Sequence, residues 1–109
     1  MDDGILELIR DIIDHEYSNP NICAKTLSSR FSIDCKILGA EFKKLFGYPI
    51  HERINMLRIA KAKEYLSDKR YKSLPLFVIE NALGFNSRIN FYRVFKELTG
   101  SSPEEYRKQ

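Results

Sequence analysis

Cysteine and histidine are scarce in this 109-residue chain, which contains two of each. Cys23 and Cys35 are too few for a disulfide framework, and no Cys-x-x-Cys pair or paired histidine spacing indicates zinc. We therefore expect reduced thiols in a cytoplasmic protein, with no metal and no other cofactor. His15 and His51 have no nucleophile pattern nearby, so both are expected to be surface residues.

Long apolar runs and glycine-rich loops are also missing. No run of 18 apolar residues occurs, so we expect no membrane span. The first residues are acidic and helical in pattern, which is unlike a signal peptide. The five glycines are scattered at turns and element ends, so no phosphate-binding loop is formed. These gaps argue against an enzyme and against a membrane protein.

Apolar and basic residues, in contrast, are plentiful. Hydrophobic residues make up 43% of the chain, with seven Phe and six Tyr, which suffices for one domain spanning residues 1–109. Residues 1–17 carry six acids and one base, whereas the remaining residues carry 17 bases and nine acids. The basic remainder indicates an anionic partner, of which DNA or RNA is the commonest.

Two segments, 38–47 and 91–100, read as copies of each other. Their matched apolar pairs are Leu38/Phe91, Phe42/Phe95 and Leu45/Leu98. This spacing of i, i+4 and i+7 places each trio on one helix face, which we expect to be buried. Lys43 and Lys96 follow the phenylalanines, and a glycine closes each copy, where helices commonly end. The cationic faces are either solvated or docking surfaces, and their duplication favours two similar docking surfaces.

The periodicity predicts an all-α fold. An acidic first helix is expected to turn its carboxylates to water. A short helix from Ile22 to Arg30 and a second helix that begins at the N-cap Asp34 predict a helix-turn-helix over about 22–46.

A long linker helix is expected over about 49–67. Its inward stripe is predicted to be apolar, and its basic residues are expected to lie on its surface; these are Arg53, Arg58, Lys61 and Lys63. A polar loop from Ser67 to Ser73 follows. The second helix-turn-helix is predicted over about 75–98, with Gly84 in its turn, and Ser102 begins a last short helix with a capping box.

At this point the sequence resembles the DNA-binding domain of AraC/XylS-type transcription activators. The matching positions are Gly84, Phe85, Phe91, Arg93, Phe95, Lys96, Gly100, Ser102, Pro103, Tyr106 and Arg107, with Arg58, Ile59, Ala62 and Leu66 in the linker helix. The resemblance implies about seven helices that form two helix-turn-helix units joined by one long helix. Each unit is expected to place its second helix in the major groove of double-stranded DNA.

The resemblance also suggests partners. Members of the family often carry a sensor or receiver domain, and some contact RNA polymerase. We therefore expect either a small stand-alone regulator or a fragment whose sensor or receiver domain lies elsewhere.

In the second unit, four residues are expected to point outward: Arg88, Ile89, Tyr92 and Arg93. By resemblance Arg93 is the leading candidate for a base contact, since an arginine can donate two hydrogen bonds to guanine. The alternative for Arg93 is a solvated or ion-paired side chain. Arg88 can read a base or hold a phosphate, and Ile89 can touch a thymine methyl group. Asn86 and Ser87 at the helix start suit either a phosphate or simple N-capping.

The first unit is expected to position more than it specifies. Its outward residues are Lys36, Gly39, Ala40 and Lys43. Lys36 and Lys43 suit phosphate contacts, whereas Ala40 stands where many relatives carry a long polar side chain. Gly39 either permits a close approach of DNA or is simply tolerated in mid-helix.

Two further expectations follow from the same residues. Glu80 stands where small residues are usual, as Ser28 does in the first unit, so its carboxylate must reach water or an arginine.

The alternative function is a helical protein-interaction module whose basic helices bind an acidic partner.

Overall fold

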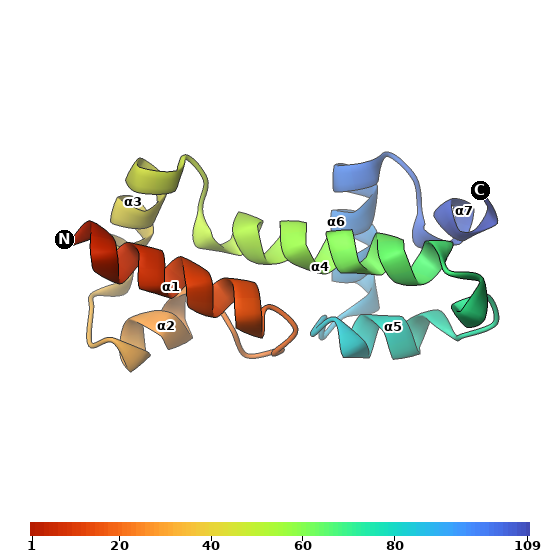
Figure 1. Ribbon diagram of the computed structural model, residues 1–109, viewed down its shortest axis with the longest axis horizontal. Coiled ribbons are helices and arrows are strands. Elements are labelled where there is room, and N and C mark those ends of the chain that lie inside the picture. The colour runs from red at the N-terminus through yellow and green to blue at the C-terminus, as the bar shows by residue number, and fades with distance from the viewer.

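The computed structural model describes all 109 residues as helices and connecting segments, without a strand. The elements are α1 (Asp3–Glu16), α2 (Ala24–Arg30), α3 (Cys35–Phe46), α4 (Ile50–Ser67), the 3-10 helix η1 (Lys69–Tyr71), α5 (Leu76–Ala82), α6 (Arg88–Thr99) and α7 (Pro103–Lys108). The predicted all-α fold is confirmed. The molecule is elongated, about 46 × 22 × 22 Å, and α4 runs along its long axis (Figure 1). None of these helices combines the length and the apolar character that crossing a membrane requires.

The helix ends follow the capping residues that the sequence provides. The Asp34 carboxylate accepts a hydrogen bond from the Ile37 amide at 3.1 Å, as predicted, and the Ser87 hydroxyl accepts one from the Asn90 amide at 3.2 Å. Ser102 and Glu105 form the predicted capping box at the start of α7. Because each cap satisfies an amide that has no partner within its helix, these residues fix where the helices begin.

Two separate cores are packed around α4. The first core is Leu6, Ile9, Ile13, Ile22, Leu27, Leu38, Phe42, Ile50 and Ile54. The second core is Ile59, Ala62, Leu66, Ile79, Leu83, Phe85, Phe91, Val94 and Phe95. Burial of each such side chain is worth about 1.5–3 kcal/mol. The amino-terminal half of α4 therefore belongs to one core, and its carboxyl-terminal half belongs to the other.

The third position of each duplicated segment is not buried as predicted. Leu45 and Leu98 are 39% and 46% exposed. In α6 the second core is instead filled by Phe91, Val94 and Phe95. The reason lies in how α3 and α6 cross the long axis, because the last turn of each projects beyond α4 (Figure 1). In α6 the last buried residue, Phe95, lies one turn before the end of the helix.

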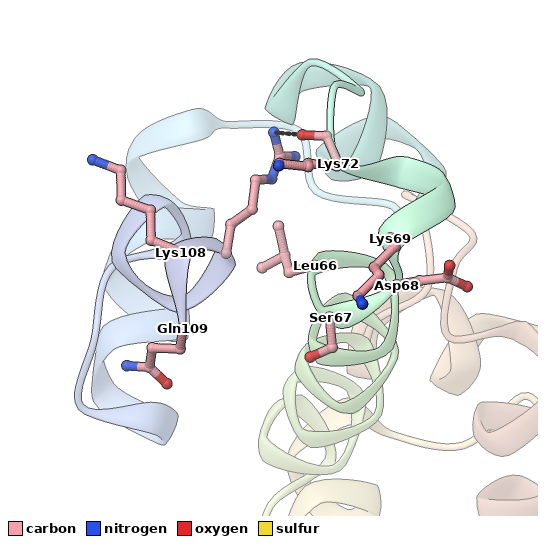
Figure 2. A pocket seen from close by; sticks show the side chains of 8 residues that line it. Leu66, Ser67, Asp68, Lys69, Lys72, Lys108 and Gln109 are labelled. Atoms are coloured by element: carbon pink, nitrogen blue, oxygen red, sulfur yellow. Dashed lines mark hydrogen bonds between the residues drawn. The ribbon is translucent and has the colours of Figure 1, made fainter.

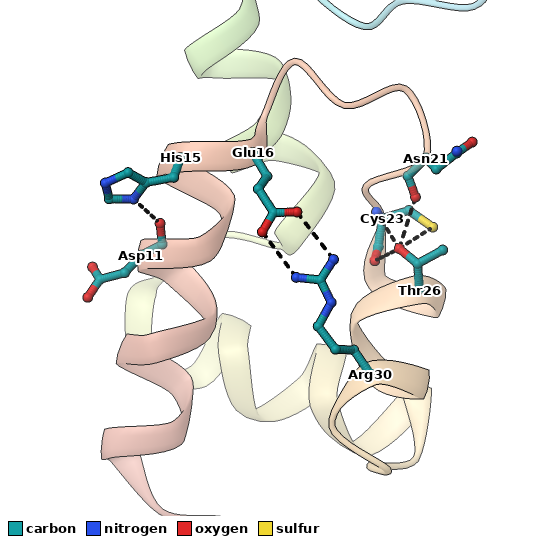
Figure 3. Close-up of polar contacts among 7 residues, drawn as sticks. All are labelled: Asp11, His15, Glu16, Asn21, Cys23, Thr26 and Arg30. Carbon is teal, nitrogen blue, oxygen red and sulfur yellow. Dashed lines mark hydrogen bonds and ion pairs between the residues drawn. The ribbon is translucent and has the colours of Figure 1, made fainter.

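The expected solvent-facing charges of α1 are partly wrong. The carboxylate of Asp14 accepts two hydrogen bonds from Arg53 of α4, both at 2.9 Å. Glu16 accepts two from Arg30 of α2, at 3.1 and 3.2 Å, across the gap between the helices (Figure 3). Both pairs are bidentate, the geometry in which arginine and carboxylate match best. The acidic helix is thus joined by charge to both of its neighbours.

Other expectations for the linker region also need correction. Arg58 was expected on the surface but is buried, with 7% exposure, because its guanidinium group donates to the carbonyl oxygens of Tyr17 and Asn19. The segment from Ser67 to Ser73, expected as a loop, contains the turn η1. Asp68, the N-cap of η1, accepts a hydrogen bond from the backbone amide of Arg70.

Gly84 lies where no other residue fits. Its φ of +88° is left-handed, and a Cβ atom there would stand 2.5 Å from the carbonyl oxygen of Ser18.

We predict that Gly84→Ala lowers the free energy of unfolding by about 1–3 kcal/mol. Gly39 is the control, because a Cβ there meets nothing within 4 Å. Gly39→Ala should raise stability by about 0.5–1 kcal/mol. Urea unfolding of both variants measures this, and equal effects would contradict the close approach.

Candidate nucleic-acid interface

Helices α3 and α6 occupy equivalent places in the two halves of the molecule. Each follows a seven-residue helix, α2 or α5, after a short turn. Both cross the long axis in the same direction, with their amino-terminal ends toward the same side of the molecule (Figure 1). This arrangement is a helix-turn-helix in each half, and the two second helices lie one after the other along the long axis.

The outward face of α3 is cationic and open. Lys36, Ala40 and Lys43 are exposed, and neither lysine forms a salt bridge. The three residues are spaced at i, i+4 and i+7, so they share one face of the helix. Gly39 is half-buried beside them and leaves open space where a side chain would be. The face offers two mobile ammonium groups and few groups that could distinguish bases.

The outward face of α6 is more elaborate. Ile89 is 82% exposed, the most exposed large apolar residue of the chain. Arg93 is exposed and is held by Glu97 at 3.2 Å and by the side-chain carbonyl of Asn90. The ion-paired alternative for Arg93 is therefore realised. Exposed pairs of this kind contribute little energy, so another hydrogen-bond acceptor can replace the carboxylate.

Arg88 has a buried partner. Its Nε donates to the carboxylate of Glu80 at 3.1 Å, and the Glu80 side chain is only 7% exposed. The expectation that Glu80 must reach an arginine or water is confirmed, and the partner is an arginine. Because the Arg88 side chain is 58% exposed, it covers the carboxylate and also faces solvent. Arg88 therefore serves the packing of α5 against α6 as well as the surface.

The two residues before α6 have different roles. Ser87 is the N-cap, so the capping alternative is realised for this residue. Asn86 is not a cap. Its side-chain nitrogen donates instead to the carbonyl oxygen of Pro20 in the first unit, at 3.4 Å. The side chain of Asn86 thus points toward the loop between α1 and α2.

Tyr92 is only partly available to a ligand. Its hydroxyl donates to the carboxylate of Glu104 in α7, and its ring packs at an edge against that of Phe91. Burial, together with the Glu104 carboxylate, raises the pKa of Tyr92 to about 12. The phenol consequently stays protonated and acts as a hydrogen-bond donor at neutral pH.

The surface has two hollows of note. The first, about 400 Å³, separates α4 from the carboxyl-terminal half of α6 and is lined by His51, Glu52, Asn55, Arg93, Val94, Glu97 and Leu98. Its two carboxylates make it unsuitable for an anion.

The second hollow, about 670 Å³, lies between the end of α4, η1 and α7, and four of the eight residues that line it are cations (Figure 2). There Arg107 donates to the carbonyl oxygen of Lys72 at 3.4 Å, while its Nε and Nη2 are buried without a partner. No residue of α3 or α6 lines this hollow, so it stands apart from the candidate interface.

Sequence reasoning missed the role of one residue, Arg58. The signal was available in its spacing, because Arg58 follows Ile54 by four residues and precedes Ala62 by four, which places it on the inward stripe.

A candidate metal site is absent, since no group of three or more ligating side chains comes together.

The Tyr92 contact predicts a distinct titration. Burial of the phenol and its contact with Glu104 both favour the protonated form, so the folded-state pKa of Tyr92 lies above the ordinary value of 10.0. The resulting contribution to stability is fully present below pH 10 and is lost as the pH rises through about 12. Near-ultraviolet titration should show that the component removed by Tyr92→Phe ionises near pH 12. Glu104→Gln should move this component toward the ordinary value. A component already near pH 10 in the unmodified chain would show that the contact does not form.

Comparison with known proteins gives the family of the chain. A helix-turn-helix domain model matches residues 27–109. The arabinose operon regulatory protein of Escherichia coli is 29% identical over 98% of this chain and 35% of its own length. The chain spans about a third of the curated relatives that it matches.

Two solved structures extend the comparison. The C-terminal domain of the response regulator yesN from Fusobacterium nucleatum is 29% identical, with a TM-score of 0.84 over 95% of this chain and 98% of that one. The DNA-binding domain of AdpA, solved with a target DNA, shares the fold at 19% identity, with a TM-score of 0.80 over 94% of this chain and 89% of that one. The chain belongs to the AraC-type helix-turn-helix family.

Proposed function

We propose that this domain binds duplex DNA sequence-specifically for a bacterial transcription regulator, with α3 and α6 in successive major-groove turns on one face of the DNA. The observation that carries this proposal is the repeated placement of two exposed, cationic second helices that cross α4 in the same direction (Figure 1). A helix-turn-helix unit reads bases with the amino-terminal part of its second helix. The AraC-type family is a family of regulator domains rather than enzymes.

The second unit is proposed to supply most of the sequence selectivity. Arg93 would exchange Glu97 for the O6 and N7 acceptors of a guanine. The exposed Ile89 side chain would contact a thymine methyl group, which would remove its apolar surface from water. Arg88 keeps its Nε on Glu80, so its terminal nitrogens would hold a phosphate or a base. Ser87 and Tyr92 would border this surface, although the Ser87 hydroxyl caps α6 and the Tyr92 hydroxyl donates to Glu104. Asn86 would reach the DNA only by giving up its contact with Pro20.

The first unit is proposed to grip the backbone. Lys36 and Lys43 carry unpaired charges, which suit phosphate contacts that position a protein without reading sequence. Gly39 and Ala40 leave the middle of the face flat. A flat face allows the helix to approach the groove closely while discriminating few bases.

The wider regulator is a further part of the proposal. Because the chain spans about a third of its curated relatives, we infer that a sensor or receiver domain accompanies it. Its setting is the bacterial cytoplasm, where RNA polymerase is a second partner. The alternative function, a module for an acidic protein partner, is not favoured, because the family is one of DNA-binding regulators.

Arg93 provides the first test. We predict that Arg93→Ala weakens binding to a duplex selected from a random pool by about 1–3 kcal/mol and relaxes preference at one base position. Fluorescence anisotropy with a panel of base-substituted duplexes measures both effects. Arg70→Ala is the matched control, since Arg70 is exposed and pairs with Asp68 outside both second helices. Equal losses for the two variants would argue against a base contact by Arg93.

Salt dependence provides the second test. If about five to seven phosphates are neutralised, log K should fall with log salt with a slope of about −4 to −7. Lys43→Ala should reduce the slope by about one and weaken all duplexes alike. Binding that is weak and insensitive to salt would refute the proposed function.

A further inference from the structure

The relative placement of the two helix-turn-helix units depends on few contacts. The substantial helix packing runs within each half of the molecule and to α4. The first unit is α1, α2 and α3 with the loops between them, and the second unit is α5, α6 and α7 with theirs. A single hydrogen bond joins the two units directly, from Asn86 to the carbonyl oxygen of Pro20. Because the two cores grip opposite halves of α4, the helix could bend or twist between them unless its middle is braced.

Arg58 occupies that middle, between Ile54 of the first core and Ile59 of the second. Its Nε donates to the carbonyl oxygen of Tyr17 at 2.6 Å, and its Nη2 donates to that of Asn19 at 3.0 Å. The guanidinium carbon also lies 5.2 Å from the ring centroid of Phe85, which is a cation–π distance. One side chain therefore contacts the α1–α2 loop of the first unit and the α5–α6 turn of the second.

The α1–α2 loop (residues 17–23) also approaches Gly84, next to the guanidinium group of Arg58, whose Nη2 would lie 3.1 Å from a Cβ atom at Gly84. A Cβ atom at this position would meet the Ser18 carbonyl group at 2.5 Å from its oxygen and 2.8 Å from its carbon, so the two backbones are in direct contact. Figure 1 shows the loop beside the turn between α5 and α6. The loop thus contacts both the Arg58 side chain and the backbone at Gly84, which are neighbours.

The burial of Arg58 is costly for a residue that only fills space. Burial lowers the pKa of its guanidinium group, and no carboxylate lies within ion-pair distance to offset the lost hydration. Two carbonyl oxygens and an aromatic face are its compensation. An aliphatic residue would pack α4 without this cost, so the arginine is explained by what its two donors hold in place.

We propose that Arg58 is a positioning residue, which locks the α1–α2 loop against the α5–α6 turn and thereby fixes the distance and angle between α3 and α6. The functional consequence rests on the proposed DNA binding. Two binding elements reinforce each other only if their separation matches that of their sites. With the lock removed, each unit would still bind its own half-site, but selectivity for the spacing between half-sites would be lost.

A measurement without DNA tests the lock itself. Nitroxide labels at Lys44→Cys on α3 and Lys96→Cys on α6, in a chain carrying Cys23→Ser and Cys35→Ser, report the distance between the helices by pulsed electron resonance. All four positions are exposed, and serine at position 23 is a favoured N-cap. The distance distribution should be narrow in this chain and should broaden about twofold with Arg58→Met, since the units then move separately.

Two further variants make the comparison specific. Arg53→Met is the matched control, because it removes an arginine of α4 whose bidentate partner, Asp14, lies within the first unit. It should leave the distribution unchanged. Arg58→Lys keeps the charge but has one ammonium group for two carbonyls, so it should broaden the distribution to an intermediate extent. If circular dichroism shows that Arg58→Met does not fold, Arg58→Lys serves as the test variant.

Binding to a series of duplexes tests the consequence. The half-sites come from duplexes selected with the unmodified chain, and their spacing is varied in single base pairs over about half a helical turn. Arg58→Met should bind the preferred spacing about tenfold more weakly than the unmodified chain. It should also bind single half-sites within about twofold and show a flatter dependence on spacing, whereas Arg53→Met should keep the original dependence.

The outcomes separate the two proposals. If the unmodified chain binds no duplex, the proposed function fails, and the label distances still decide whether Arg58 locks the units. If binding occurs but folded Arg58 variants keep both the narrow distribution and the original spacing dependence, the lock is wrong. Equal losses on full sites and half-sites would also overturn it, because they would reveal general destabilisation.

Discussion

The fold depends on one helix that serves two cores. Eighteen residues of α4, about 27 Å of helix, supply Ile50 and Ile54 to one cluster and Ile59, Ala62 and Leu66 to the other. α2 and α5 have seven residues each, a length at which isolated helices are marginal in water. Each group of helices gains its core by packing on α4. The shared helix also sets how far apart α3 and α6 lie.

Much of this architecture could be predicted because it is encoded locally. Asp34 and Ser102 act within a single turn, so capping could be recognised from a few neighbouring residues. The helical spacing of the apolar residues also indicated a long helix, and α4 spans Ile50–Ser67. These features do not depend on which other helix is nearby, so a sequence pattern is sufficient to find them.

The failures share a different physical origin. Leu98 has the correct period for burial, but where α6 crosses α4 determines that its last turn is exposed, and this crossing is a tertiary property. Arg58 has the correct period for burial and the wrong chemistry, because its acceptors lie some forty positions earlier in the chain. For the candidate interface, exposure of Arg88, Ile89 and Arg93 agrees with the pattern, whereas the Glu104 partner of Tyr92 comes from another helix and was not predicted.

The proposed lock at Arg58 has an evolutionary consequence. Its acceptors at Tyr17 and Asn19 are main-chain carbonyl groups, which every amino acid possesses. Side chains in this loop can therefore drift between descendants of the gene without loss of the contact, whereas insertions or deletions would move the acceptors out of reach. The contact therefore constrains the length of the loop, one arginine and one glycine, and it leaves the identity of the loop residues free to change.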